Sequence, residues 1–293
     1  MDILIQQIVS GLATGGIYAS LALALVMIYQ ATDVVNFAQG SMAMFSTYLC
    51  WSVLQMGQSY WVAFFATLVI AFAGGLLIER IVIRPVEDAP ILTIVIVTLG
   101  LIFILTSVAG WIYSWIQKPF PSPFPSKPIK FGNIIFGAHD LGAIVVTLIV
   151  LLLLFLFFRY TTLGLAMRAA AQNPTSSRLC GIRVGWMLAL GWGLASAFGA
   201  VAGMMVAPVV FLDPNMMVGI QLYAFAAATV GGFTSPLGAV VGGFLVGVTE
   251  NLVGSYVSFI GTELKLTVAL AMIIIVLLVK PSGLFGRSTV RRV

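Results

Sequence analysis

The sequence predicts an all-α polytopic membrane protein with about eight membrane helices, some of them broken or re-entrant. The first observation is composition: 61% of the 293 residues are apolar and 8% are charged, whereas a soluble domain carries roughly 25% charged residues. This composition excludes a soluble enzyme, a secreted disulfide scaffold, a disordered tail and a β-barrel, whose strands alternate apolar and polar residues. The second observation is that the charges are clustered, which leaves seven charge-free stretches: 3–32, 34–78, 89–117, 141–158, 184–212, 214–249 and 266–279.

The first part of the chain supplies four spans, because a helix that crosses a bilayer needs about 20 mostly apolar residues. No basic segment precedes stretch 3–32, so we expect it to remain as an anchor rather than to be cleaved as a signal peptide. Stretch 34–78 is long enough for two spans, with a break near Gly57, and stretch 89–117 fits one span.

The loops indicate on which side each span begins, since cytoplasmic loops are enriched in Lys and Arg. The loop at about 159–183 contains four arginines and no acid, and the tail after the last span is also basic. We therefore expect this loop and the C-terminus in the cytoplasm. One span, 141–158, separates the loop from the segment at about 118–140, which we expect outside. Five prolines in that segment exclude a helix, because proline has no N–H donor, and predict an extended external cap.

Stretch 214–249 must begin and end on the same side of the membrane. The span before it, 184–212, ends outside, and the acidic segment after it is also expected outside. Its middle, from Gly231 to Pro236, interrupts a helix, and backbone breaks at membrane depth only where protein or water satisfies its polar groups. We expect a re-entrant pair of a short and a longer helix; the alternative is one kinked span. The last span is 266–279.

Small residues recur at a spacing of four, which lets helix backbones approach closely in lipid. We expect most of them to pack helices within the chain, although a few could line a path or contact a second membrane subunit. The small residues at this spacing are Gly191, Ala195, Gly199 and Gly203, Gly238 with Gly242, and Gly243 with Gly247.

We expect residues 1–293 to form a single transmembrane domain.

A similar break, from Asp33 to Ser41, interrupts two apolar runs near the start of the chain. A pair of interrupted membrane segments in two halves of a chain is the best sequence indication of a transport pathway. Each polar side chain at the breaks could instead cap a half-helix. The candidates for lining the path are Asn36, Gln39, Gly40, Ser41, Thr229, Gly231, Gly232, Thr234 and Ser235.

The arginine-bearing loop has an architecture of its own. The segment from Leu163 to Gln172 is rich in strong helix formers, and Asn173 can cap a second short helix that begins at Pro174. Gly181 suits the left-handed end of that helix. We expect a compact pair of short helices, which is either an ordinary loop on the lipid headgroups or a docking element for a cytoplasmic partner.

Six segments, in the right order, resemble the LivH-type permeases, the membrane subunits of bacterial ATP-binding cassette importers for branched-chain amino acids and related compounds. The segment 159–172 followed by 179–182 resembles the coupling loop of that family, and 35–40 resembles its V-N-F-A-x-G motif. The remaining matches are Glu79–Arg80 with Arg84–Val86, similar to the first cytoplasmic loop, and 200–203, 231–243 and 281–287 in the second half.

The resemblance implies a permease-like fold and a passive conduit that other subunits drive. The implied partners are a second, LivM-type permease, two cytoplasmic ATPase subunits and a periplasmic binding protein, in the bacterial inner membrane. ATP and Mg²⁺ would be used by the ATPase subunits, and this chain would hold no cofactor. The implied solutes are branched-chain or other amino acids, or a related small polar solute such as urea. The residues implied in coupling to the ATPase are Gly164, Arg168, Ala169, Asn173, Pro174 and Gly181.

The chain departs from the family at a few positions, where Gln39 and Ser41 stand in place of a frequent histidine and an acid. It also lacks a phosphate-binding G-x-x-x-x-G-K-[ST] loop and an H-E-x-x-H zinc motif, so we expect neither catalytic residues nor a metal site. Nucleic acid is not an expected partner. The alternative function is an ion-coupled secondary transporter, which would need buried ionisable groups; Asp33, Asp213 and Glu250 are the acids near apolar ends.

Overall fold

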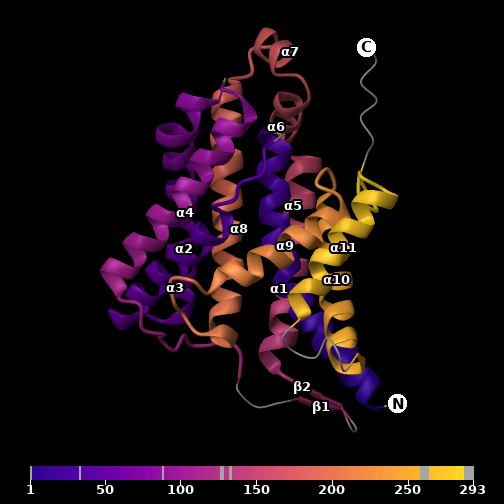
Figure 1. The fold of residues 1–293 in the computed structure, drawn as a ribbon. Helices are drawn as coiled ribbons and strands as arrows, with labels where there is room; N and C mark the ends of the chain where they lie inside the picture. Colours follow the sequence, from indigo (N-terminus) through magenta and orange to yellow (C-terminus); the bar gives the residue numbers. More distant parts are fainter. Residues whose placement is uncertain are drawn as a thin grey trace. The chain divides into compact units, whose positions relative to one another are not determined.

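The structure, a computed structural model, describes residues 2–32, 34–87, 89–125, 129–131, 134–257 and 264–286. Most of these residues are helical (Figure 1). The elements in chain order are α1 (Asp2–Thr32), α2 (Gln39–Gln55), α3 (Tyr60–Ile78), the π-helix η1 (Glu79–Ile83), the 3₁₀ helix η2 (Arg84–Val86), α4 (Ile91–Tyr113), β1 (Ile129–Phe131), β2 (Ile134–Phe136), α5 (Ala138–Tyr160), α6 (Thr162–Gln172), α7 (Pro174–Leu179), α8 (Val184–Val210), α9 (Met217–Gly231), α10 (Pro236–Tyr256) and α11 (Lys265–Val279).

Within the described residues, six helices are long and apolar enough to cross a membrane, and α9 and α11 are two shorter apolar helices. This confirms the predicted polytopic helical class with broken segments. The proline-rich segment contains the exception, a small antiparallel hairpin in which Ile129 pairs with Phe136 and Phe131 with Ile134.

The helices form two compact units. Unit 1 contains residues 1–26, 124–151 and 219–293, and unit 2 contains residues 27–123 and 152–218. Helices α1 and α5 each contribute to both units. The single transmembrane domain expected for the whole chain stays a prediction.

Helix α2 is the inner helix of unit 2, where it packs against α3, α4 and α8. Glycines allow this close approach. Gly203 of α8 lies against Ala43 and Thr47 of α2, and a side chain at Gly75 of α3 would come within 2.5 Å of the Trp192 carbonyl oxygen. The expected close packing along the small-residue face of α8 is therefore confirmed.

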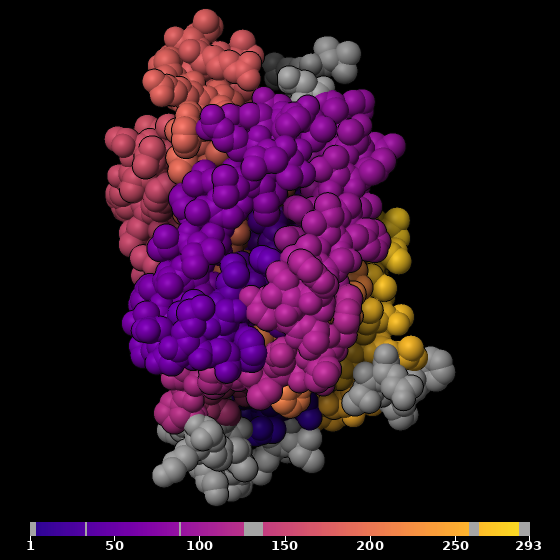
Figure 2. All heavy atoms as spheres, turned by 90° about the vertical axis from the view of Figure 1, so that its left-hand side faces the viewer, coloured from indigo at the N-terminus to yellow at the C-terminus, as the bar shows by residue number. Residues whose placement is uncertain are grey.

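The outer surface of unit 2 is strongly apolar. Helices α3 and α4 expose large side chains such as Phe65, Val69, Leu92 and Phe103, and Figure 2 shows both helices on this surface. Soluble monomers rarely expose an apolar area of this extent, whereas helices that face lipid do.

Helix α10 uses two glycine faces in unit 1. One face meets α9, with Gly242 against Ala227, and the other meets α1, with Gly243 against Ala19 and Gly247 against Gly15. Because glycine has no Cβ, the backbones lie in direct contact, as expected for small residues at this spacing in a membrane.

The end of α3 differs from the expected loop. Instead of stopping, the helix continues through η1 and η2 as far as Val86. Glu79 is buried there and forms an ion pair with Arg84 at 3.5 Å. The ion pair joins the first residue of η1 to the first residue of η2 through one oxygen of the buried carboxylate. Pro85, which lacks an N–H donor, lies where the helix tightens to 3₁₀ geometry.

Two segments expected on one side of the membrane meet at the far end of α8. Lys118 and Leu212 form an antiparallel bridge in which each N–H donates to the other carbonyl oxygen at 2.9 Å. The Gln117 amide also donates to Asp213 at 3.4 Å. The start of the proline-rich segment and the end of α8 therefore share one side, as predicted.

Candidate functional site

A buried side-chain network holds the first break, between α1 and α2. The Asn36 amide nitrogen donates to the Gln39 side-chain oxygen at 3.2 Å, and the Asn36 oxygen accepts from the Ala38 N–H at 3.0 Å. Gln39 donates in turn to the Ala195 carbonyl oxygen of α8 at 2.9 Å. Both amide side chains are fully buried, so removing a partner would leave a polar group without water.

The network joins the first break to α8, which capping alone would not require. The Gln39 amide nitrogen lies so close to Gly199 that a Cβ at that position would overlap it. Gly40 and Ser41 follow in the first turn of α2 and are buried. The structure thus brings the four predicted residues of this break together, whereas Asp33 lies outside the described residues.

At the second break, between α9 and α10, the polar side chains bond mainly to the backbone of the helix ends. Ser235 caps α10 by accepting from the Gly238 N–H at 3.0 Å, and Thr229 donates to the Phe225 carbonyl oxygen at 2.7 Å. Thr234 is exposed. The helix–break–helix pair predicted for 214–249 is confirmed, and Ser235 fits the capping interpretation.

The second break is also covered by the segment after α11, which we call the C-terminal turn (280–286). Gly232 of the break has φ +104° and Gly283 of the turn has φ +77°, and a Cβ on Gly283 would lie 2.5 Å from the Gly232 Cα. The turn therefore fixes the buried glycines Gly231 and Gly232 in place. Two backbone hydrogen bonds join it to the end of α9, from Leu284 N–H to the Val230 carbonyl at 2.8 Å and from Phe285 N–H to the Gly231 carbonyl at 3.0 Å.

The sequence did not indicate that Glu250 would be buried within unit 1. The Tyr18 hydroxyl of α1 donates to the Glu250 carboxylate at 2.9 Å, and Tyr223 of α9 also bonds to it. The two tyrosine rings stack with centroids 4.6 Å apart. Glu250 follows the charge-free stretch without a helix breaker, a signal that α10 continues past the charge.

The arginine-bearing loop has the predicted architecture. Thr161 caps α6 by accepting from the Gly164 N–H at 2.9 Å, and Asn173 caps α7 by accepting from the Ser176 N–H at 2.9 Å. Pro174 is the first residue of α7. These caps make the two helices a stiff unit, which we call the α6–α7 loop (161–183).

The predicted coupling residues lie on different parts of this loop. Gly164 is buried against the end of α5, where a side chain would overlap the Phe157 carbonyl oxygen, so it shapes the loop. Arg168 is exposed and Ala169 half-buried. Gly181 has φ +81° with open space around it. Sequence reasoning missed Leu179, which exposes 86% of its surface beside Gly181; an apolar residue in a polar, arginine-bearing loop was the available signal.

The segment after α3 meets the start of α8. The Arg80 guanidinium lies 5.6 Å from the ring centroid of Trp186, and Arg84 lies against Gly185, where a Cβ would overlap its guanidinium. Two predicted cytoplasmic segments therefore share one end of α8, opposite the Lys118–Leu212 bridge.

These features together define a class of protein. Several membrane-length helices, a short apolar helix that meets one of them at a break with buried glycines, and a stiff polar loop at one end of α8 are the parts of a multi-pass membrane permease.

Comparison with known proteins then gives the family. Residues 7–277 match the family model described as "Branched-chain amino acid transport system / permease component". The chain is 32% identical to the LivH permease protein of Salmonella typhimurium, over 99% of this chain and 97% of that protein. It is 30% identical to BraD of Pseudomonas aeruginosa, over 99% and 98%, and 31% identical to a probable LivH of Methanocaldococcus jannaschii, over 91% and 87%.

The chain therefore belongs to the family of branched-chain amino acid transport system permease components. This assignment confirms the resemblance drawn from the sequence motifs and makes the chain a permease subunit of a transport system. It replaces the alternative of an ion-coupled secondary transporter.

Proposed function

We propose that this chain is one of two membrane-spanning subunits of an importer for branched-chain amino acids, or for a related small polar solute such as urea, and that ATP drives it through separate subunits. The solute class rests on the relatives, which are named as branched-chain amino acid permeases. The family match over residues 7–277 is the observation that carries the proposal as a whole.

The proposed assembly contains a second, LivM-type permease, two cytoplasmic ATPase subunits and a periplasmic binding protein. ATP and Mg²⁺ would be bound by the ATPase subunits. The complex would lie in a bacterial inner membrane, with the α6–α7 loop and the C-terminus in the cytoplasm, because the arginines concentrate there.

A mechanical connection within unit 2 supports coupling through the α6–α7 loop. The loop is stiffened by two caps and packs against α8. Helix α8 begins at Val184 and accepts the Gln39 hydrogen bond at Ala195, about 17 Å further along at 1.5 Å per residue. Movement of the loop by an ATPase would therefore shift the helix that holds the first break.

The contact with the ATPase would centre on Leu179. An apolar side chain that is almost entirely exposed in the permease alone contributes to binding if a partner buries it, because its apolar surface then leaves water. Ala169 and Gly181 would supply the small surface around this side chain, and Arg168 a pair for an acid at the rim, worth under about 1 kcal/mol.

The test uses Leu179→Ala in the reconstituted complex. Losing a leucine that is buried at the interface costs about 1–3 kcal/mol, which corresponds to a weakening of ATPase binding of about five- to 150-fold. Stimulation of ATP hydrolysis by loaded binding protein and solute uptake should fall together. Leu278→Ala on α11, where the leucine is similarly exposed at 80%, is the matched control. Normal stimulation in Leu179→Ala would remove this loop from the coupling path.

A second measurement tests the solute. Binding protein encoded with the complex, loaded with leucine, isoleucine, valine or urea in turn, should support uptake for the true solute only. Coupled ATP hydrolysis without uptake of any of the four would retain the importer and reject the proposed solutes.

A further inference from the structure

One face of α8 carries two open cavities in succession, both within unit 2. The upper cavity, of about 440 Å³, is bounded by Arg183, the N-cap of α8, and by Trp186, Met187 and Leu190 of the helix. The lower cavity, of about 540 Å³, is bounded on α8 by Leu194 and Phe198. The spacing of these six residues keeps them on one side of a helix with 3.6 residues per turn. We call these two cavities, which follow one another along the same side of α8, the α8 groove.

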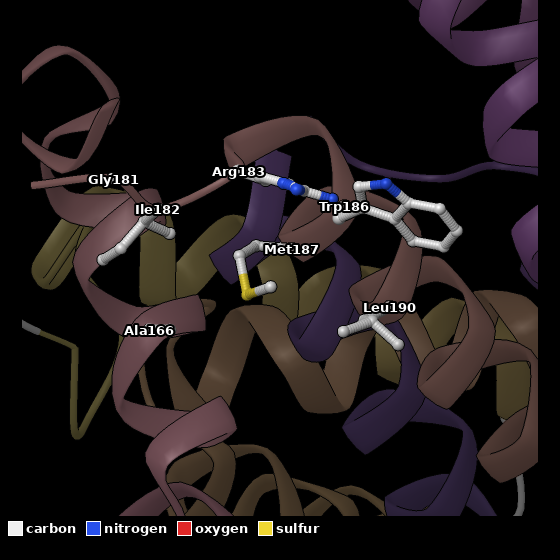
Figure 3. A pocket seen from close by; sticks show the side chains of 7 residues that line it. All are labelled: Ala166, Gly181, Ile182, Arg183, Trp186, Met187 and Leu190. Atoms are coloured by element: carbon white, nitrogen blue, oxygen red, sulfur yellow. The ribbon is translucent and has the colours of Figure 1, made fainter. Parts of the chain in front are cut away.

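The walls opposite α8 come from neighbouring elements of the same unit. Ala166 of α6 and Ile182 face the upper cavity, and the end of α5, residues 153–160, faces the lower cavity. Figure 3 shows Arg183 extending toward Trp186 along the upper part, with Met187 and Leu190 beneath them.

The chemistry changes from one end of the groove to the other. The upper end has the positive charge of Arg183 and the half-exposed indole of Trp186, and Arg80 lies over the same indole at 5.6 Å. Below Trp186 the α8 residues are wholly apolar. None of the described residues that line either cavity is acidic, so an anion entering the upper end meets no opposing carboxylate.

The length of the groove matches one leaflet. From Arg183 to Phe198 the helix rises about 22 Å at 1.5 Å per residue. Half of a hydrocarbon core of about 30 Å is roughly 15 Å, which leaves one to two turns for the headgroup level. Arginine and tryptophan are the side chains that anchor at that level, and basic pockets between membrane helices bind anionic headgroups.

We infer that the α8 groove is a binding site for an anionic phospholipid of the leaflet next to the α6–α7 loop. The phosphate lies at Arg183 and the Trp186 ring edge, with Arg80 adding positive charge, and one acyl chain runs past Leu190 and Leu194 to Phe198. The bound lipid fills the space between α8 and the α5–α6 connection. It therefore supports the attachment of the α6–α7 loop to α8.

A phospholipid fits better than a segment of a soluble partner protein because of the depth of the lower cavity. The lower cavity lies beside the last turns of α5 and the third and fourth turns of α8, both part of membrane-length helices. A soluble partner reaches the loop but not this level. The inference requires membrane insertion and no particular solute, so it stands apart from the proposed transport function.

Native mass spectrometry of the full-length chain in detergent tests the site. The chain is titrated with phosphatidylglycerol and, separately, with phosphatidylcholine of the same acyl length. We expect one phosphatidylglycerol to bind about five- to tenfold more tightly than phosphatidylcholine, the preference that one or more arginines near a headgroup supply. Arg183→Gln should abolish most of this preference, while Arg178→Gln, an exposed arginine on α7 that lines neither cavity, should keep it.

A second variant probes the acyl chain. Leu194→Trp fills the lower cavity and should weaken both lipids equally, leaving the headgroup preference intact. Equal binding of the two lipids by the wild-type chain, or equal loss in Arg183→Gln and Arg178→Gln, overturns the inference. Unchanged lipid binding in Arg183→Gln, together with loss of ATPase subunits in pull-down of the complex, would assign the upper cavity to the partner protein instead.

Discussion

Replacing Gly283 by alanine tests whether the C-terminal turn clamps the second helix break. Gly283 has φ +77°, a left-handed conformation that a residue with a Cβ adopts at a cost of about 1–2 kcal/mol. The new methyl group would also lie 2.5 Å from the Gly232 Cα and 2.6 Å from its nitrogen. Because both neighbours are backbone atoms, the turn must move away from α9.

The structure supplies a control with the same backbone conformation and no neighbours. Gly57, between α2 and α3, has φ +80°, and a methyl group added there would have nothing within 4 Å. Gly57→Ala should therefore cost only the backbone component. Gly283→Ala adds overlap with packed atoms, typically about 1–3 kcal/mol, for a total loss of about 2–5 kcal/mol.

Unfolding of the purified chain in mixed micelles of mild and denaturing detergent measures the two free energies, and uptake by the reconstituted complex measures function. We expect Gly283→Ala to lose the larger free energy and to reduce uptake, since the turn holds Gly231 and Gly232 at the break. Equal losses for both variants would refute the clamp, because the shared backbone component alone would then explain them.

Three further predictions concern the buried polar groups and the sides of the membrane. Gln39→Leu removes two side-chain hydrogen bonds and should destabilise unit 2 by about 1–3 kcal/mol and lower uptake; unchanged uptake would make this network structural only. Tyr18→Phe removes a hydrogen bond to Glu250 and should cost about 1.5–3 kcal/mol in the same unfolding titration, whereas no loss would mean that Tyr223 suffices. Cys180, which is exposed, should react with an impermeant thiol reagent in inside-out vesicles without ATPase subunits. Ser122→Cys should react only from the opposite side; labelling of both from one side would contradict the proposed orientation.

Local chemistry explains why much of the fold was predictable. The lengths of the apolar stretches located the membrane helices, because a segment that crosses lipid must satisfy its own backbone hydrogen bonds as a helix. Helix ends followed from residues that act within a few positions of themselves. Asn173 caps α7, Ser235 caps α10, and α11 ends at Lys280, each close to the expected position.

Features that depend on distant contacts were not predictable. Glu79 looked like the start of a loop, but it is buried beside Arg84, and the chain stays helical as far as Val86. Glu250 looked like the end of a span, and two tyrosines from other helices make its burial possible.

The candidate site also combines residues that the sequence identified with contacts that it could not predict. Polarity in apolar surroundings identified Asn36 and Gln39. The hydrogen bond from Gln39 to α8 was not predictable, because it depends on the absence of a side chain at Gly199, 160 positions away in the sequence. The C-terminal turn was recognisable only as a motif, because its hydrogen bonds reach back to α9. The exposure of Leu179 reflects how α6 and α7 pack on α8.

The contact of α1 with α10 can form only after both helices have been synthesised, and they lie far apart in the sequence. Tyr18 and Glu250, which hydrogen-bond across this contact, are separated by 232 residues. At 5–20 residues per second a ribosome needs roughly 10–50 s to make that length. Through this interval α1 resides in the bilayer with its glycine face and the Tyr18 hydroxyl lacking their final neighbours. The side-chain contacts of α1 with α10 are therefore completed only after the ribosome has made α10.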